Sequence, residues 1–353
     1  MEMTYKDSTN EAVELLKRLI ATPSTSRDET AAADVLEEYM REKSLSPHRH
    51  GNNLWCMSDG FDESKPTILL NAHIDTVKPV AGWVHDPFVP VVEGDKLYGL
   101  GSNDCGGGLM SLLQAFMLLQ GKHNAYNLIY LASCEEEVSG KNGIESVLPL
   151  LPPISFAIVG EPTNMQPAIA EKGLMVIDAV AHGKAGHAAR NEGDNAIYHA
   201  MKDIQWLSEW TFPKHSELLG AVKNTVTIVN AGTQHNVIPD QCTFTIDVRS
   251  NECYTNEEIF SFFQSRLTSE LKARSFRLSS SSIDPSHPFI QRCIAKGLTP
   301  FGSPTLSDQA LMRFPSLKLG PGQSSRSHTA DEYIKISEID NAISLYVELL
   351  EGM

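Results

Sequence analysis

The segment Thr67-Ile-Leu-Leu-Asn-Ala-His-Ile-Asp75 is the strongest indicator of the fold. It starts with a short, nearly continuous apolar run, which is typical of a strand that is buried on both faces of a sheet. Similar runs are Asn127-Leu-Ile-Tyr-Leu131 and Phe156-Ala-Ile-Val159, and a helix-like stretch from Gly108 to Leu119 separates the first run from the second. This alternation of strands and helices predicts a layered α/β domain.

A different pattern begins near Gly173 and ends near Ser282. Its segments follow the order β-α-β-β-α-β, which is the ferredoxin-like pattern. They are the strands Leu174–Ala181, Thr225–Asn230 and Cys242–Arg249, the helices Asn195–Trp210 and Asn256–Leu271, and the extended stretch Phe276–Ser282. We therefore expect residues 173–282 to form an inserted α+β domain, and residues 1–172 and 283–353 to form one discontinuous α/β domain.

The composition excludes several classes of protein. The 353 residues suffice for two domains, at roughly 100 to 200 residues per domain. Hydrophobic residues at 41 % and charged residues at 21 % are ordinary globular usage. A formal net charge of −15, which no basic block offsets, argues against binding to nucleic acid or to an anionic membrane surface.

The termini and the cysteines predict a cytoplasmic protein. No apolar run approaches the roughly 20 residues that span a bilayer, and the first residues contain neither a basic leader nor a small-residue cleavage site. The cysteines form no CxxC pair, so we expect free thiols rather than a disulfide scaffold or a thiolate zinc site. They are Cys56, Cys105, Cys134, Cys242, Cys253 and Cys293.

Five short polar clusters follow apolar runs or lie in glycine-rich loops, where open α/β sheets bind ligands. Taken singly, each has a structural interpretation, such as a hydrogen-bonded pair or a solvated turn. Together they supply two imidazoles and several carboxylates, which are the ligands of Zn²⁺ or a similar divalent ion. The clusters are His73-Ile-Asp75, Gly99–Gly108 around Asp104, Glu135-Glu-Glu137, Gly160-Glu-Pro162 and Ser327-His-Thr329.

Two clusters can be interpreted in more detail. Residues i and i+2 share one side of an extended chain, so Asp75 can accept the second ring proton of His73 and fix its tautomer for metal binding. Asp104 lies among glycines that let the backbone turn sharply, and a carboxylate held there can give one oxygen to each of two cations. The same glycines could bind a phosphate, but the loop contains no Lys or Arg and Asp104 would repel the anion.

The order HxD, GxxDxxGG, EEE, GEP and SHT resembles the acetylornithine deacetylase and succinyl-diaminopimelate desuccinylase family, whose relatives include aminoacylases and glutamate carboxypeptidases. The resemblance covers nearly the whole chain, because Gly183–Ala189 and the segments Asn236–Asp240 and Asp247–Arg249 match motifs of the inserted domain. It implies a zinc-peptidase-like catalytic domain with a layered mixed sheet, and an inserted domain that forms a dimer and acts as a lid.

The resemblance implies two Zn²⁺ ions per chain, with Co²⁺ or Mn²⁺ as possible substitutes. Asp104 would bridge the two ions, and Asp75 would orient one of the ligands. The implied ligands are His73, Asp104 and Glu161 for one ion, and Asp104, Glu137 and His328 for the other.

The acidic triplet can be aligned with the family in two ways. The family motif is Asp-Glu-Glu, and the downstream Gly143 suggests aligning Glu135 with the Asp, which makes Glu136 the general base and Glu137 the ligand. A shift by one residue makes Glu135 the base and Glu136 the ligand, and the sequence leaves both alignments open. The base would take a proton from a metal-activated water and return one to the leaving amine.

The resemblance also implies three functional residues in the inserted domain. His187 would donate a hydrogen bond to the oxyanion in the site of a partner subunit, in a homodimer; a surface loop histidine is the alternative. Asn236 and Arg249 would bind the α-carboxylate of the substrate, for which a guanidinium gives bidentate hydrogen bonds. Because Arg249 ends an alternating strand, a structural salt bridge is the rival interpretation.

Among family members the chain is most similar to acetylornithine deacetylases, through Ala170–Met175 and the length before it. This implies hydrolysis of N-acetylornithine to ornithine and acetate, a step of arginine biosynthesis. Ser102-Asn103 and Cys105-Gly106 stand where the family often has Arg and Met-Lys, so succinyl-diaminopimelate, succinylornithine and acetylcitrulline are alternatives, as are the substrates of aminoacylases and dipeptidases. A non-catalytic binding protein would be expected to lack a ligand or the base, and none is missing.

Overall fold

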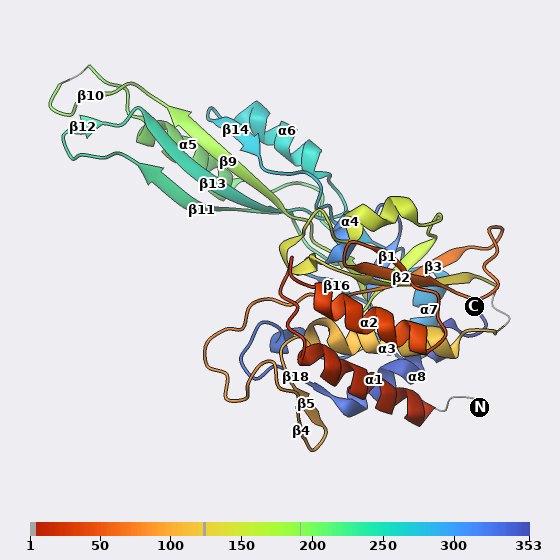
Figure 1. Cartoon of the computed structure of the whole chain (residues 1–353). Coiled ribbons are helices and arrows are strands. Elements are labelled where there is room, and N and C mark those ends of the chain that lie inside the picture. The colour runs from red at the N-terminus through yellow and green to blue at the C-terminus, as the bar shows by residue number, and fades with distance from the viewer. Residues whose placement is uncertain (1–4, 123–124, 191) are drawn as a thin grey trace. The chain divides into compact units, whose positions relative to one another are not determined.

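The computed structural model describes residues 5–122, 125–190 and 192–353, and the chain forms two compact units (Figure 1). The first unit contains the chain up to Ile169 together with Ile283–Phe301 and Ser307–Met353. The second unit contains Ala170–Ser282 and Gly302–Leu306. Within the described ranges, no helix has both the length and the apolar character needed to cross a membrane.

The first unit is built on a mixed sheet whose central strands are parallel. β3 (Thr67–His73) pairs in parallel with β6 (Asn127–Ser133) and with β7 (Phe156–Val159). The strand order is β1-β2-β6-β3-β7-β17-β8-β15, and β16 pairs with β8; β15 and the last residues of β8 and β16 belong to the second unit. The remaining strands are β1 (His48–His50), β2 (Asn53–Met57), β17 (Ser316–Lys318), β8 (Ala168–Glu171), β15 (Ser281–Ser282) and β16 (Phe301–Ser303).

Both faces of this sheet are covered (Figure 1). Ile68 and Leu70 of β3 lie in one hydrophobic cluster, whereas Leu69 lies in another on the opposite face. This burial on two sides explains why the central strands are continuous apolar runs. The first cluster includes residues of α1 (Tyr5–Ile20), α2 (Thr30–Glu42), α3 (Gly107–Leu118), α7 (Pro288–Ala295) and α8 (Ile336–Leu350), and the second includes residues of α4 (Ile144–Val147).

Helix α3 starts against the turn that follows β7. A β-carbon on Gly108 would overlap the carbonyl oxygen of Gly160, so a glycine is required for this close approach. The contact brings the loop that precedes α3, with Asp104, next to the residue that follows Gly160. That residue is Glu161, and the fold thereby joins two of the polar clusters.

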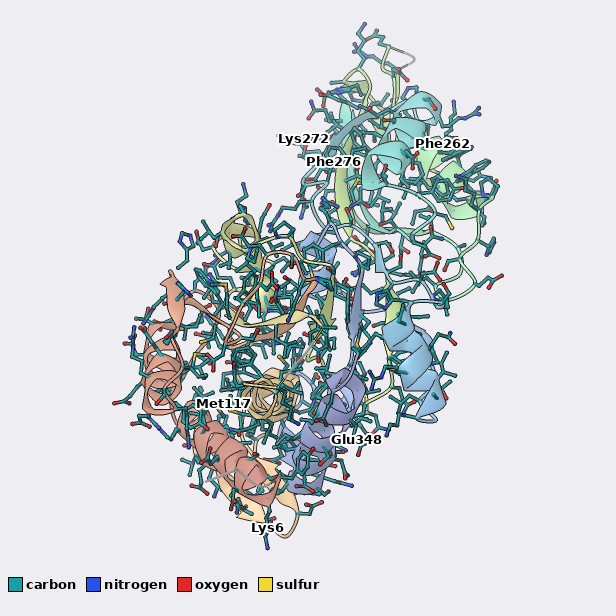
Figure 2. All side chains as sticks on the ribbon, turned by 90° about the vertical axis from the view of Figure 1, so that its right-hand side faces the viewer. Lys6, Met117, Phe262, Lys272, Phe276 and Glu348 are labelled. Carbon is teal, nitrogen blue, oxygen red and sulfur yellow. The ribbon has the colours of Figure 1, made fainter. Side chains whose placement is uncertain are left out.

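The second unit has the predicted ferredoxin-like order. Its four-stranded antiparallel sheet has the order β11-β13-β9-β14. Phe262, labelled in Figure 2, lies in an aromatic cluster with its ring tilted against those of Trp206 and Trp210. The elements are β9 (Met175–His182), α5 (Ala196–Glu209), β11 (Lys223–Ala231), β13 (Gln241–Arg249), α6 (Asn256–Arg266) and β14 (Glu270–Ala273).

Two predicted bounds in this unit are wrong. The second helix does not run to Leu271 but ends at Arg266, and β14 takes the place of the strand expected at Phe276–Ser282. The carboxylate of Asp203 accepts a hydrogen bond from the backbone N–H of Thr268 at 3.1 Å. Since that N–H no longer donates to a helical carbonyl, the helix ends before it and the chain turns into the sheet.

Two small sheets complete the fold. The first unit has β18-β5-β4, and the second has the pair β10-β12. Their bounds are β4 (Val91–Glu93), β5 (Lys96–Tyr98), β18 (Tyr333–Lys335), β10 (Gly186–His187) and β12 (Val237–Ile238).

Candidate metal centre

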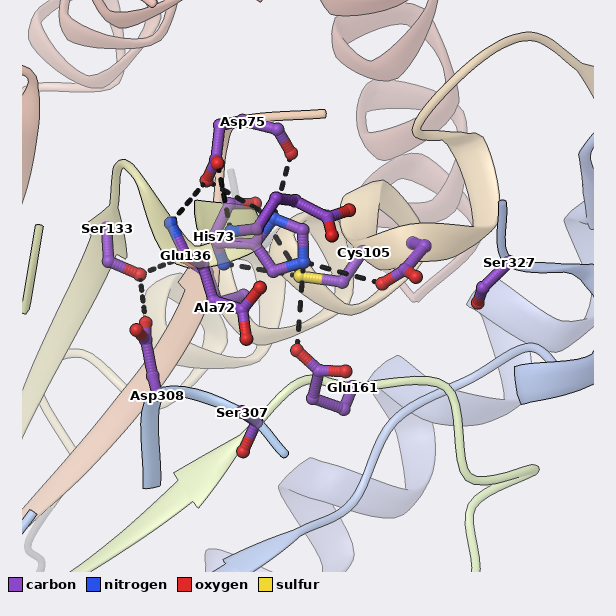
Figure 3. A network of polar contacts seen from close by, with 12 residues as sticks. Ala72, His73, Asp75, Cys105, Ser133, Glu136, Glu161, Ser307, Asp308 and Ser327 are labelled. Atoms are coloured by element: carbon purple, nitrogen blue, oxygen red, sulfur yellow. Dashed lines mark hydrogen bonds and ion pairs between the residues drawn. The ribbon is translucent and has the colours of Figure 1, made fainter. Parts of the chain in front are cut away.

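Parallel strands bring three of the five polar clusters to one edge of the sheet. His73 is the last residue of β3, the acidic triplet follows β6, and Glu161 follows β7. In the β3–β6 register, His73 lies beside Ser133, the last residue of β6. Because the carboxyl ends of neighbouring parallel strands meet, the side chains converge there, as Figure 3 shows for His73, Glu136 and Glu161.

The imidazole of His73 is buried and has a defined orientation. Its Nδ1 lies 2.8 Å from the backbone carbonyl oxygen of Asp75, so Nδ1–H donates there and Nε2 is the ring nitrogen that is left for a metal ion. Nε2 lies 3.4 Å from Oδ1 of Asp104 and 3.7 Å from Oε1 of Glu161. The carboxylate of Asp75, the acceptor that the sequence suggests, is farther from Nδ1, at 3.6 Å.

The carboxylate of Asp75 instead holds the turn that carries the acidic triplet. It accepts hydrogen bonds from the backbone N–H groups of Glu136 at 3.0 Å and Glu137 at 3.2 Å, and from the hydroxyl of Ser26 at 2.7 Å. Burial disfavours the charge on Asp75, but the interactions with His73, Ser26 and the Glu136 N–H hold its pKa below the usual value.

Asp104 lies between two histidines. Its Oδ1 is 3.4 Å from Nε2 of His73, and its Oδ2 is 3.5 Å from Nε2 of His328. Burial disfavours the charge, but hydrogen bonds from His73 and Ser327 hold the pKa of Asp104 below the usual value. A carboxylate that directs one oxygen to each of two imidazoles has the arrangement of a bridging ligand.

The three acids of the triplet have three different environments. Glu135 has a left-handed backbone, with φ of 55°, and its carboxylate accepts a hydrogen bond from Nδ2 of Asn142 at 2.9 Å. Oε2 of Glu137 lies 3.0 Å from Nε2 of His328. This hydrogen bond raises the pKa of His328 to about 9.

Glu136 is partly exposed, but its carboxylate is enclosed by other acids. Desolvation raises the pKa of Glu136 well above the usual value, and the negative charges of Glu161 and Asp308 reinforce the effect. A raised pKa makes a carboxylate a stronger base than an ordinary glutamate, which suits a group that takes up a proton and later releases it. The backbone N–H of Glu136 donates to the carboxylate of Asp75, and this hydrogen bond fixes the backbone position of Glu136.

The donor set fits a divalent metal ion. Ligand atoms of His73, Asp104 and Glu137 all lie within 4.8 Å of one another, and so do those of His73, Cys105 and Glu161. Oε1 of Glu161 is buried and receives no hydrogen bond from the residues that the structure describes. Burial, reinforced by Asp104, raises the pKa of Glu161 to about 8, so the site would gain from a cation.

Two acids near the centre escaped the sequence analysis. Asp308 is buried and accepts a hydrogen bond from the hydroxyl of Ser133 at 2.6 Å (Figure 3). Glu332 is buried and accepts hydrogen bonds from backbone N–H groups of the Asp104 loop. The only sequence signal for Glu332 was its place just after the Ser327–Thr329 cluster, and Asp308 lies in no recognisable motif.

The three candidates of the inserted domain lie in the second unit. His187 and Asn236 are neighbours there, because the N–H of Ala188 donates to the carbonyl oxygen of Asn236 at 3.0 Å. Nδ1 of His187 accepts from the N–H of Ala189 at 3.1 Å, so the ring proton is on Nε2. The guanidinium of Arg249 donates to both carboxylate oxygens of Asp247, at 2.9 and 3.2 Å, as in the rival salt-bridge interpretation.

Fold and donor set together define an α/β metallohydrolase whose candidate ligands gather at the carboxyl edge of a mixed sheet. The sequence model of Peptidase family M20/M25/M40 matches residues 69–352. The chain belongs to this family, and it is therefore a metal-dependent hydrolase.

Individual proteins are similar at lower identity. A LysW-lysine/LysW-ornithine hydrolase of Sulfurisphaera tokodaii is 26 % identical, over 100 % of this chain and 99 % of that protein. An acetylornithine deacetylase of Proteus mirabilis is also 26 % identical, over 96 % of each chain. The Bacillus subtilis YXEP protein, a dinuclear metal-binding peptidase of the M20 family, has a TM-score of 0.72 at 18 % identity, over 99 % of this chain and 100 % of that one.

Proposed function

We propose that this protein hydrolyses the amide bond of an N-acyl amino acid, with N-acetylornithine as the first candidate substrate. The observation that carries the proposal is the orientation of Asp104, whose two oxygens face His73 and His328. This orientation supports a centre with two divalent ions. The full-length similarity to an acetylornithine deacetylase supports the choice of substrate.

In the proposed centre Asp104 would help to hold both ions, one with His73 and Glu161 and the other with Glu137 and His328. We call the position at His73 and Glu161 the first position, and the position at Glu137 and His328 the second position. Imidazole and carboxylate donors suit Zn²⁺, and Co²⁺ or Mn²⁺ would be possible substitutes. When bound, the two ions would lower the pKa of a water molecule and polarise the amide carbonyl.

Glu136 is the proposed general base. It would take a proton from the water as the oxygen attacks the carbonyl carbon, and it would give a proton to the amide nitrogen as the C–N bond breaks. The products are a carboxylic acid and a free amine. Glu135 is a weaker candidate because its carboxylate is already bonded to Asn142.

The oxyanion of the tetrahedral intermediate needs a hydrogen-bond donor. We assign this role to His187 of a partner subunit, which the Nε2 proton of its ring supports. The homodimer itself is supported by β11, an edge strand whose Ile228 and Val229 are 50 % and 53 % exposed. An exposed apolar edge strand favours pairing with a second chain. Asn236 and Arg249 are the proposed partners of the substrate carboxylate.

A turnover screen of the zinc-loaded protein tests the proposal. The substrates would be N-acetylornithine, acetylcitrulline, succinylornithine and succinyl-diaminopimelate, with a set of dipeptides alongside. We expect the highest kcat/KM for N-acetylornithine. A higher value for a succinylated substrate would contradict the acyl assignment, and cleavage of dipeptides alone would overturn the proposed reaction.

A further inference from the structure

The two proposed metal positions are built in different ways. The first position depends on the ends of β3 and β7, which are paired strands: Asn71 lies beside Val159, and the N–H of Gly160 donates to the carbonyl oxygen of Asn71 at 2.8 Å. The sheet itself therefore sets the distance between His73 and Glu161. The second position joins Glu137 to His328, and both lie outside the strands.

The loop of the bridging Asp104 and the segment of His328 are tied together by Glu332. The buried carboxylate of Glu332 accepts hydrogen bonds from three backbone N–H groups of the loop. The donor–acceptor distances are 3.2 Å for Gly101, 2.8 Å for Asn103 and 2.9 Å for Asp104. The backbone at Asp104 is thus held by Glu332, which lies in the same segment of the chain as His328.

Asn103 makes a second set of bonds between the same two segments. Its side chain is fully buried, and its Nδ2 donates to the carbonyl oxygen of Gln323 at 3.0 Å and to the hydroxyl of Ser327 at 3.2 Å. Its Oδ1 accepts from the N–H of Gln323 at 3.0 Å. Ser327 precedes His328 and also hydrogen-bonds the Asp104 carboxylate.

His328 needs such support because of its own backbone. It has a left-handed conformation, with φ of 58°, which is unfavourable for a non-glycine residue. Its side chain is also 52 % exposed, so packing alone does not fix it. Besides the contact of the imidazole with Glu137, hydrogen bonds on the preceding residue Ser327 help to hold it in place.

We propose that Asn103 and Glu332 form a clamp that assembles the second metal position by holding both Asp104 and His328, whereas the first position depends on the clamp through Asp104 alone. Both are positioning residues, since they act on the ligands Asp104 and His328 and not on a substrate. The inference rests on the ligand assignment of the proposed function. It also gives a role to Asn103, which stands where the family pattern differs.

The test is zinc binding by the full chain with Asn103→Ala and Glu332→Gln. Apo protein would be titrated with Zn²⁺ in a calorimeter, and bound zinc would be counted by elemental analysis after dialysis. We expect the weaker of two binding events to lose roughly 10- to 100-fold in affinity, as for other residues that support metal ligands. The stronger event, which we assign to the first position, should lose less affinity, because His73 and Glu161 do not depend on the clamp.

Asn127→Ala is the matched control. Asn127 is also buried and fully bonded, to Asp62, Lys65 and Thr67, but at the start of β6 and away from the site. It should retain both ions, and the unfolding temperature of each apo variant would show that it is folded. Glu332→Gln keeps the shape and an acceptor oxygen, so it answers the question if Asn103→Ala does not fold.

The outcomes separate the clamp from the ligand assignment. Two bound ions with unchanged affinities in both variants would overturn the clamp and leave the proposed centre intact. Equal loss of both ions, or the same loss in Asn127→Ala, would also overturn it, because the effect would then be general. Fewer than two ions in the wild-type protein would overturn the ligand assignment and the clamp with it.

Discussion

Glu135, Glu136 and Glu137 show how far neighbouring residues of one type can differ in chemistry. The first is bonded within its own turn, the second is surrounded by acids, and the third faces His328. The difference arises from the backbone. Glu135 has a left-handed conformation, and the backbone N–H groups of Glu136 and Glu137 donate to Asp75, so the three side chains have different neighbours. A pattern of three identical letters carries none of this information.

The role of Glu136 can be separated from that of its neighbour by two matched substitutions. Glu136→Gln should leave both metal ions bound and lower kcat by roughly 10²- to 10⁴-fold, because a proton carrier is lost while the shape is kept. Glu135→Gln should change kcat little. Steady-state kinetics with metal analysis of both variants would check this. The opposite ranking would mean that the alternative alignment, with Glu135 as base, is right.

Protons and metal ions should compete for Glu161 and His328. In the metal-free chain their pKa values are raised to about 8 and about 9, so both groups hold a proton at pH 7. Zinc needs the deprotonated forms, so binding at pH 7 should release more protons than binding above pH 9. Calorimetry in buffers of different ionisation enthalpy measures the number. Equal release at both pH values would contradict the expectation.

At the level of strands and helices, much of the first unit was predictable because its pattern is local. The runs that begin at Thr67, Asn127 and Phe156 are the observed β3, β6 and β7, and the helix predicted at Gly108–Leu119 is α3. Because these strands are parallel, the polar residues that follow them lie together at the carboxyl edge of the sheet. The ends were less predictable: α6 is terminated by Asp203, which lies far away in the sequence.

Other parts of the site could not be predicted, because they depend on contacts between distant segments. Asp308 reaches Ser133 from a loop after the inserted unit, and Glu332 bonds to the loop of Asp104. Neither acid lies in a recognisable motif. Each accepts hydrogen bonds from a backbone N–H or a hydroxyl group, and such groups are too common in any sequence to indicate a partner. The expected link from the Asp75 carboxylate to His73 was plausible by spacing, yet the backbone carbonyl is the nearer acceptor.

This geometry gives Asp75 a testable role as the link between two turns. Asp75→Asn keeps the carbonyl that holds His73 but weakens the hydrogen bonds to the Glu136 and Glu137 N–H groups, at a cost of roughly 1–3 kcal/mol. We expect kcat to fall by about ten- to hundredfold, with zinc retained at the first position. Ser26→Ala, which removes a peripheral bond to the same carboxylate, should have a smaller effect. Loss of zinc with normal kcat after reloading would refute this role.

For the molecule as an assembly, the proposed role of the inserted unit depends on a second chain. Its sheet ends in β11, and the residues that follow Val226 on that strand are mostly exposed. A ferredoxin-like sheet that is open at one edge can continue into an identical sheet by antiparallel pairing. Such pairing would cover Ile228 and Val229, which are exposed in a single chain.

A mixing experiment tests both the dimer and the donor role of His187. Glu136→Gln and His187→Ala should each be nearly inactive as pure proteins. If His187 serves the partner's site, a mixed dimer has one site with both Glu136 and His187, so random exchange of subunits should restore about a quarter of the wild-type activity. Subunits would be unfolded, mixed and refolded with zinc, and size would be measured by sedimentation. No recovery in a confirmed mixed dimer would show that both residues act within one chain.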